Sequence, residues 1–161
     1  MSVDYNNFKV IIDTREQQPW EFERVAYANR KLDTGDYSVE GYENLLCIER
    51  KKSVSEIANN VTEKRFKDVI ERMRQYKYSF LILEFDLEDI YRYPVGSNVP
   101  KRMWNRLKIT PGFIIKNLLE LQLQHNIHVV FCGDASNASK IALTLMKKVY
   151  ELEYREETNN V

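Results

Sequence analysis

The sequence contains few cysteines, no excess of charge of either sign and no long apolar run. Its two cysteines, Cys47 and Cys132, lie inside apolar stretches and form no Cys-x-x-Cys or Cys/His pattern that would hold zinc. This argues against a disulfide scaffold and favours a reducing, intracellular setting. The N-terminus lacks a secretion signal, and no apolar run has membrane-spanning length. We therefore expect a soluble protein.

The charges balance, with 24 Lys plus Arg and 24 Asp plus Glu in a chain of 161 residues. Net charge therefore identifies no partner, and attraction for nucleic acid depends on where the charges lie. The length suits one domain with one core. No repeat, low-complexity segment or linker divides the chain. We expect residues 1–161 to form a single domain whose end frays from about residue 151.

Short apolar runs alternate with helical patterns, which predicts an α/β sandwich around a mixed sheet. The expected strands are 8–13, 37–39, 45–51, 78–85 and 127–132. The second and third of these should pair as an antiparallel hairpin, because turn residues separate them. The strand at 78–85 is apolar on both faces, as parallel strands often are.

Capping residues predict where the helices begin. A Ser-x-x-Glu capping box starts a helix at Ser53, and Thr110 followed by Pro111 starts another that runs to about residue 124. Thr62 is expected to cap a helix with an apolar stripe formed by Phe66, Val69, Ile70 and Met73. Asp134 or Ser136 opens the last helix, with one apolar face formed by Ile141, Leu145, Met146 and Val149.

Residues 45–52 read LLCIERKK, so an apolar strand ends in four charged residues. Side chains alternate faces along a strand, which places Glu49 and Lys51 on one side and Arg50 on the other. Asp36 precedes the neighbouring strand and can approach Glu49 across the hairpin. Two facing carboxylates repel each other unless a cation lies between them, and Mg²⁺ binds through one or two carboxylates while keeping several waters.

These three residues are chemically sufficient for hydrolysis of nucleic acid. A metal ion held by Asp36 and Glu49 would polarise a phosphodiester, while Lys51 steadies the attacking water or the charge of the transition state. A structural interpretation stays open, because a Glu-x-Lys pair at an exposed strand edge is only a weak salt bridge. Asp36 could likewise be a turn residue after Gly35.

The segment DTRE, at 13–16, ends the first strand and contains Asp13, Arg15 and Glu16. Ligands bind at strand ends in open α/β sheets, so charged clusters at several strand ends support one another. A solvated strand-to-loop transition is the alternative. Glu84 closes another strand, and we expect it to be structural.

Basic residues on two other segments are candidates for contact with phosphates. Lys64 and Arg65 lie on the helix after Thr62, whereas Lys67 on the same helix is expected to be solvated. The segment PKRMWNRLK, at 100–108, suits phosphate contact and stacking on an unpaired base through Lys101, Arg102, Trp104 and Arg106. A basic surface loop around a partly buried tryptophan explains this segment nearly as well.

Several segments, in the same order, resemble the nuclease domain of the XPF family of structure-specific endonucleases. They are DTRE, TGDYSV at 34–39, LLCIERKKSVSEI at 45–57, KRFKDVIERM at 64–73, FLILEFD at 80–86 and LLELQLQHNIHVVFC at 118–132. The resemblance implies a restriction-endonuclease-like α/β fold, in which helices flank a central mixed sheet. It also implies a Mg²⁺- or Mn²⁺-dependent site that cleaves branched DNA such as flaps and forks.

Carried over by position, the resemblance implies that Asp36 and Glu49 hold the metal and that Lys51 acts at the attacked phosphate. The residues that would complete the site are Asp13, Arg15, Glu16 and Arg50, with Arg65 as a basic position on the helix behind it. The family motif ends in an Asp where this chain has Ser55. If Lys52 is an insertion, that position becomes Glu56, which we assign to the helix cap.

The resemblance further implies a homodimer formed through the last helices and a role in recombination, repair or replication. Nothing after Val149 could form the helix-hairpin-helix module of many members, so the chain resembles short stand-alone forms such as those of phages. Two alternatives stay open: an inactive DNA-binding or scaffolding partner of another nuclease, and a Holliday-junction resolvase or general nuclease on the same core. The presence of Asp36, Glu49 and Lys51 together favours an enzyme.

Overall fold

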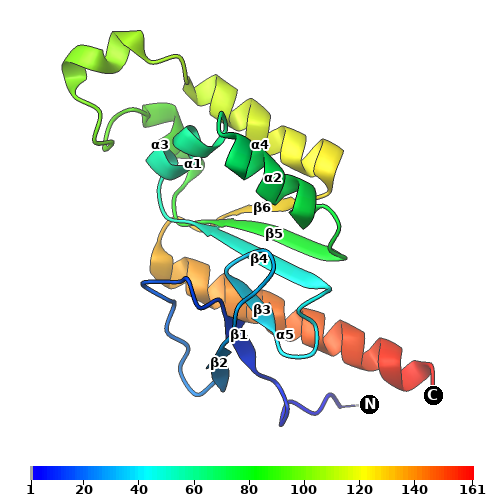
Figure 1. The fold of residues 1–161 in the computed structure, drawn as a ribbon. Helices are drawn as coiled ribbons and strands as arrows, with labels where there is room; N and C mark the ends of the chain where they lie inside the picture. The colour runs from blue at the N-terminus through cyan, green and yellow to red at the C-terminus, as the bar shows by residue number, and fades with distance from the viewer. Residues whose placement is uncertain (1) are drawn as a thin grey trace.

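The computed structural model describes residues 2–161, which fold around a six-stranded sheet in the order β2-β1-β3-β4-β5-β6 (Figure 1). The strands are β1 (Val10–Ile12), β2 (Tyr27–Asn29), β3 (Tyr37–Val39), β4 (Leu46–Lys51), β5 (Tyr78–Leu83) and β6 (His128–Phe131). β3 is antiparallel to both β1 and β4, whereas β1 pairs parallel with β2, and β4, β5 and β6 run parallel to one another. The predicted α/β fold with a mixed sheet is confirmed.

Helices cover both faces of this sheet (Figure 1). One face carries α1 (Val54–Asn60), α2 (Lys64–Met73), α3 (Leu87–Arg92) and α4 (Pro111–His125). The long helix α5 (Ala135–Asn159) crosses the other face. The connection between α3 and α4 contains a short 3-10 helix, η1 (Lys101–Arg106), and projects beyond the sheet (Figure 1). No helix within residues 2–161 combines the length and apolar character needed to cross a membrane.

Alternation along β4 and β5 assigns their side chains to two separate cores. Ile48 and Ile82 pack with α5, in the core that includes Met146. Cys47 and Leu81 belong to the core on the opposite face, beneath α1, α2 and α4. On β4, side chains two or four residues away from Cys47 therefore face α2, and those two residues away from Ile48 face α5.

Three predicted helix starts are confirmed by their caps. The side chains of Ser53, Thr110 and Asp134 each accept a hydrogen bond from a backbone N–H in the first turn of α1, α4 and α5. The prediction for α2 was wrong, because its N-cap is Glu63 and makes no side-chain cap. Thr62 lies one residue earlier, and its hydroxyl donates to the carbonyl of Asn59 at 3.5 Å.

The expected fraying from about residue 151 is also wrong, because α5 continues to Asn159. The side chain of Glu153 is buried and accepts hydrogen bonds from the Lys77 ammonium at 2.7 Å and the Tyr78 hydroxyl at 2.8 Å. Charge-assisted contacts of this kind attach the end of the helix to the start of β5.

The packed face of α5 differs from the expected one at its N-terminal half. Ile141 is 39% exposed, whereas Ala138 and Ala142 are fully buried against the sheet. Small side chains at these positions let the helix backbone approach the strands closely, so the larger neighbouring residue lies outside the contact. Met146 and Val149 are buried as predicted.

Candidate active site

β4 carries Glu49 and Lys51 to the face of the sheet covered by α2. The two residues are two and four positions after Cys47, so their side chains lie on the same face of the strand as Cys47. Both line a hollow under α2 together with Phe66. The Glu49 side chain is 15% exposed and that of Lys51 is 8% exposed. Their Oε1 and Nζ atoms lie 3.5 Å apart. The pair is therefore nearly buried, unlike an exposed salt bridge at a strand edge.

Asp36 lies directly opposite Glu49. β3 pairs with β4 in the register that sets Tyr37 against Ile48. The residue just before β3 therefore faces the residue that follows Ile48 on β4. The Oδ2 atom of Asp36 accepts a hydrogen bond from the backbone N–H of Arg50 at 2.7 Å. Asp36 and Glu49 line a common hollow. The structure thus brings together the two carboxylates predicted from the hairpin.

Gly35 makes this close approach possible. Its φ is +91°, and a Cβ there would lie 2.7 Å from the Sγ of Cys47 and 3.0 Å from the carbonyl oxygen of Ile48. Only glycine adopts this conformation readily while leaving that space to the neighbouring strand. The turn that precedes β3 is consequently pressed against β4.

Both carboxyls are shifted towards their protonated forms. Burial raises the pKa of Asp36 to about 8, and the negative charge of Glu49 adds to this increase, although the hydrogen bond from Arg50 opposes it. Burial also raises the pKa of Glu49, against the opposing effect of the Lys51 ammonium. Two facing, partly buried carboxyls without a full complement of positive charge are an unfavourable arrangement that a bound cation would relieve.

The Lys51 ammonium lies between two glutamates. It is 3.5 Å from Oε1 of Glu49 and 3.6 Å from Oε1 of Glu56, and it lies 5.1 Å from the centre of the Phe66 ring. Glu56 also accepts the backbone N–H of Lys52 at 2.9 Å. Only half of the predicted capping box therefore forms: Ser53 caps the Glu56 N–H, whereas the Glu56 carboxylate accepts from Lys52 instead of from the N-cap N–H. Glu56 also helps to position the lysine.

Asp13 and Arg15 form a tight pair at the end of β1. The Nε of Arg15 donates to Oδ2 of Asp13 at 2.7 Å, and the Leu32 N–H donates to Oδ1 at 2.8 Å. Burial alone would raise the pKa of Asp13, but these hydrogen bonds together lower it. Both residues line the hollow of Asp36 and Glu49. The oxygens of Asp13 are occupied by donors, so its contacts are those of a structural residue beside the site.

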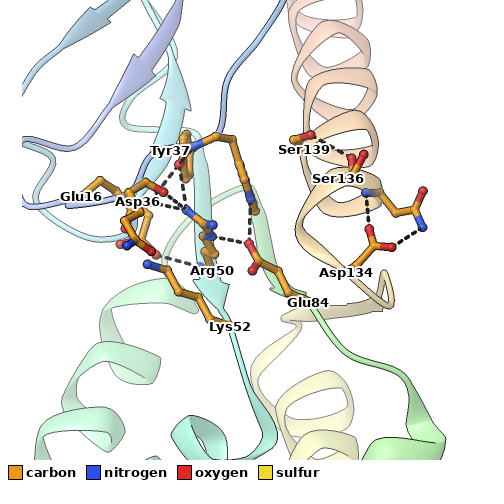
Figure 2. Close-up of polar contacts among 12 residues, drawn as sticks. Glu16, Asp36, Tyr37, Arg50, Lys52, Glu84, Asp134, Ser136 and Ser139 are labelled. Atoms are coloured by element: carbon orange, nitrogen blue, oxygen red, sulfur yellow. Dashed lines mark hydrogen bonds and ion pairs between the residues drawn. The ribbon is translucent and has the colours of Figure 1, made fainter.

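Arg50 points to the opposite side of β4, in a buried network with Glu16 and Glu84 (Figure 2). Its Nε donates to Oε1 of Glu84, and its Nη1 lies 3.1 Å from Oε2 of Glu16. The guanidinium also lies 4.8 Å from the centre of the Trp20 ring, and the Trp20 Nε1 donates to Glu84 at 2.7 Å. The expected structural role of Glu84 is explained by these contacts.

Glu16 connects this network to the Asp36 side. It accepts a hydrogen bond from the Tyr37 hydroxyl at 2.8 Å, and its charge contributes to the raised pKa of Asp36. Burial raises the pKa of Tyr37, which keeps its hydroxyl protonated and able to donate. Glu16 is thus paired with a cation and a hydroxyl, and is less available to hold a metal than Asp36 or Glu49.

The carboxylates at this site could supply only a small number of ligands to a magnesium or manganese ion. Among residues 2–161, no group of three or more His, Cys, Asp or Glu side chains is arranged to hold a metal. Asp36 and Glu49 nevertheless offer two facing, partly uncompensated carboxyls, and Mg²⁺ binds to proteins through one or two carboxylates plus water. The chemistry of this pair is compatible with such an ion.

The predicted basic residues separate into two groups. Arg65 on α2 lines both hollows that contain Glu49, whereas Lys64 is exposed and lines neither. The residues of the second group belong to η1 and lie away from the carboxylates, in the projecting connection: Lys101, Arg102, Trp104 and Arg106. The Trp104 Nε1 donates to the Val99 carbonyl at 2.9 Å, so its ring is held in place.

Sequence reasoning missed Arg72 and Thr34, which line the hollow of Asp36 and Glu49. The Arg72 Nε donates to the Thr34 Oγ1 at 3.1 Å. The signal for Arg72 was its position about two helical turns after Arg65, which places both side chains on the same face of α2. Thr34 carried no comparable signal, because its contact joins segments far apart in sequence.

A mixed sheet flanked by helices, with carboxylates and a lysine at the end of one strand, defines the restriction-endonuclease-like class. The sequence matches the ERCC4 domain over residues 12–145. The chain therefore belongs to the ERCC4-domain family, and the predicted relation to the XPF nuclease domain is confirmed.

Solved structures share this fold, among them two of XPF. XPF from Aeropyrum pernix superposes with a TM-score of 0.65 at 22% sequence identity, over 88% of this chain and 64% of that chain. XPF from Aeropyrum pernix in complex with DNA gives a TM-score of 0.62 at 20% identity, over 89% and 65% of the two chains. This chain thus spans less than two thirds of their length. A comparison with curated proteins found no match.

Proposed function

We propose that the protein is a DNA endonuclease that uses a divalent metal ion to hydrolyse phosphodiester bonds. The observation that carries this proposal is that Asp36, Glu49 and Lys51 lie together at one end of β4, with both carboxyls partly buried and their pKa values raised. A carboxylate pair with strongly perturbed pKa values in a hollow is typical of a functional site. Membership of the ERCC4-domain family supports the same assignment.

Asp36 and Glu49 would hold the metal ion. When bound, Mg²⁺ or Mn²⁺ would polarise the phosphodiester and lower the pKa of a water molecule. Lys51 would donate a hydrogen bond to a phosphate oxygen or to the attacking water, and Glu49 and Glu56 keep its ammonium in place for this task. Arg50 would act indirectly, because its backbone N–H orients Asp36 while its side chain is committed to Glu84 and Glu16.

We further propose that the substrate is branched DNA, such as flaps and forks, and that the protein works as a homodimer through its C-terminal helices. The support for DNA is the basic η1 segment and the similarity to a structure of XPF in complex with DNA. Exposed apolar residues on α4 and α5, among them Leu119, Leu123 and Leu152, are compatible with a contact between protomers. A role in recombination, repair or replication would follow from such substrates.

The test is cleavage of labelled flap, fork, four-way junction and linear duplex DNA, with Mg²⁺, with Mn²⁺ and with EDTA. We expect metal-dependent cuts near the branch of the flap and the fork, and little cleavage of the linear duplex. Preferential cutting of the four-way junction would favour a junction resolvase on the same core. Binding of these DNAs without cleavage in either metal would favour an inactive partner of another nuclease, and equal rates in EDTA would contradict metal dependence.

A further inference from the structure

Arg72 lies beside the carboxylate pair, but the reaction described above gives it no role. The side chain lines the same hollow as Asp36 and Glu49 and comes from α2, which also supplies Arg65 to this hollow. A positive charge at this place is therefore next to the atoms where the phosphate of a nucleic acid would bind. Phosphate contacts supply most of the affinity of proteins for DNA and fix how the strand lies on the protein.

Arg72 carries its charge without a carboxylate partner among residues 2–161, unlike several other arginines. Arg15 pairs with Asp13 at 2.7 Å, and Arg50 pairs with Glu16 and Glu84. The Nη1 of Arg74, the residue that caps the C-terminus of the same helix, lies 3.5 Å from Oε2 of Glu71. The hydrogen-bond partner of Arg72 is instead the neutral hydroxyl of Thr34, which contacts only Nε. Among residues 2–161 no carboxylate lies within ion-pair distance of this guanidinium, and its Nη atoms remain able to donate.

The partner of Arg72 belongs to the turn that also places Asp36. Thr34 is 6% exposed, and Gly35 presses this turn against Cys47 and Ile48. Thr34 and Asp36 are therefore fixed relative to each other, with one oriented towards the guanidinium and the other towards Glu49 and the backbone of Arg50. The turn sets the position of the arginine relative to the carboxylate pair.

We propose that Arg72, oriented by Thr34, binds a backbone phosphate adjacent to the phosphodiester that is cut, and so sets the register of the DNA strand over Asp36 and Glu49. The proposal rests on the proposed nuclease function. A guanidinium presents a planar set of donors that matches two phosphate oxygens, whereas an ammonium acts as a point charge. Its charge also offsets the repulsion between the carboxyls and an approaching phosphate.

The first experiment measures binding of the full chain to a labelled fork in metal-free buffer at a series of salt concentrations. The variants are Arg72→Gln, Arg72→Lys and Thr34→Val, with Arg74→Gln, at the C-cap of the same helix, as the matched control. We expect Arg72→Gln to weaken binding about tenfold and to reduce the slope of log Kd against log salt by about one. Arg72→Lys and Thr34→Val should keep the slope, because they keep the charge, and should weaken binding by a smaller factor.

The second experiment replaces single phosphates near the cleavage position by neutral methylphosphonates. At one position the replacement should weaken binding of the wild type and of Arg74→Gln about tenfold, but should leave the affinity of Arg72→Gln unchanged. A structural role for the arginine predicts no such position, and urea unfolding of each variant separates loss of the fold from loss of the contact.

The proposal is overturned if Arg72→Gln keeps the wild-type salt slope, if no methylphosphonate position loses its effect in this variant, or if the wild type does not bind the fork. These outcomes are distinct from a failure of the proposed function. If the wild type cleaves the fork and Arg72→Gln keeps the wild-type slope of log Kd against log salt, only the role of Arg72 is contradicted. A chain that binds as predicted but never cleaves with Mg²⁺ or Mn²⁺ contradicts only the nuclease assignment.

Discussion

At the scale of single residues, Asp36 has a carboxyl whose ionised form is disfavoured by its surroundings. Burial and the nearby Glu49 raise its pKa to about 8 in the folded chain, whereas an aspartate in an unfolded chain titrates near about 3.9. The folded protein therefore binds the extra proton between these two pH values. It follows that the contribution of Asp36 to the free energy of unfolding falls as pH rises from about 4 to about 8.

Asp36→Asn should consequently stabilise the metal-free protein, and more so at high pH. The amide can still accept the Arg50 N–H but cannot ionise, so we expect a gain of roughly 2–4 kcal/mol at pH 9 and a much smaller gain at pH 5. Urea unfolding in EDTA at the two pH values measures this difference. Added Mg²⁺ should then stabilise the wild type and leave Asp36→Asn unchanged, since a ligand stabilises only the state that binds it. A gain independent of pH would contradict the assigned pKa.

At the scale of elements, the two faces of β4 belong to two different groups of contacts. Glu49 and Lys51 face α2 and the carboxylate site, while Arg50 enters the network with Glu16 and Glu84 on the other face. This network joins β4 to β5 and to the segment after β1. Because the backbone of Arg50 also holds Asp36, the packing on one face of the strand supports the geometry on the other.

Glu84→Gln tests this support. The substitution removes one of the two charge partners of a buried guanidinium, the other being Glu16. Breaking a buried ion pair costs about 3–5 kcal/mol. We expect the free energy of unfolding in urea, followed by the fluorescence of the adjacent Trp20, to fall by about that amount. The control is Glu88→Gln, whose side chain is 78% exposed and pairs with Arg92; exposed pairs contribute about 0–1 kcal/mol. Equal effects of the two substitutions would contradict the supporting role.

Much of this arrangement could be predicted from local patterns. The period of two along residues 45–51 assigned Glu49 and Lys51 to one face, and the hairpin placed Asp36 opposite them. The caps at Ser53, Thr110 and Asp134 were also visible in the sequence. These features depend on residues that are close along the chain, so a single sequence contains the information that determines them.

The features that were missed depend on distant contacts or on weak patterns. β2 has a short, largely exposed sequence, and only its pairing with β1 makes it a strand. The end of α5 is ordered by Glu153, whose partners Lys77 and Tyr78 lie far away along the chain. The same is true of Arg72 and Thr34. Such pairs cannot be predicted from the spacing of residues within a short stretch of sequence.

At the scale of the whole molecule, basic and acidic residues are equal in number but unevenly distributed along the chain. The connection between α3 and α4 carries four basic residues and no acidic residue between Tyr93 and Thr110, although the chain has no net charge. This connection projects beyond α1 and α3 (Figure 1). The first residues of this connection, among them Gly96, line one hollow together with the segment that follows Lys51, which includes Lys52. The connection therefore concentrates basic charge in one projecting segment, and only its first residues lie beside the segment that follows β4.

Replacing Lys101, Arg102 and Arg106 by serine should weaken DNA binding without damaging the carboxylate site. We expect the slope of log Kd against log salt to decrease by about two to three, as each lost phosphate contact lowers it by about one. Cleavage at saturating DNA should stay near the wild-type rate. The control replaces Lys140 and Lys147 on α5, which are exposed and lie outside this connection. A slope equal to that of the control would assign the DNA contact to another surface.

The most direct test of the central claim is the rate of metal-dependent cleavage of a labelled fork by Asp36→Asn and Lys51→Met, compared with Lys52→Met. Asp36 and Lys51 lie at the carboxylate site, whereas the Lys52 side chain is exposed. We predict that the first two variants, folded as judged by urea unfolding, lose at least about 100-fold in rate, and that Lys52→Met cleaves like the wild type. Wild-type cleavage by either Asp36→Asn or Lys51→Met would contradict the assignment of the site.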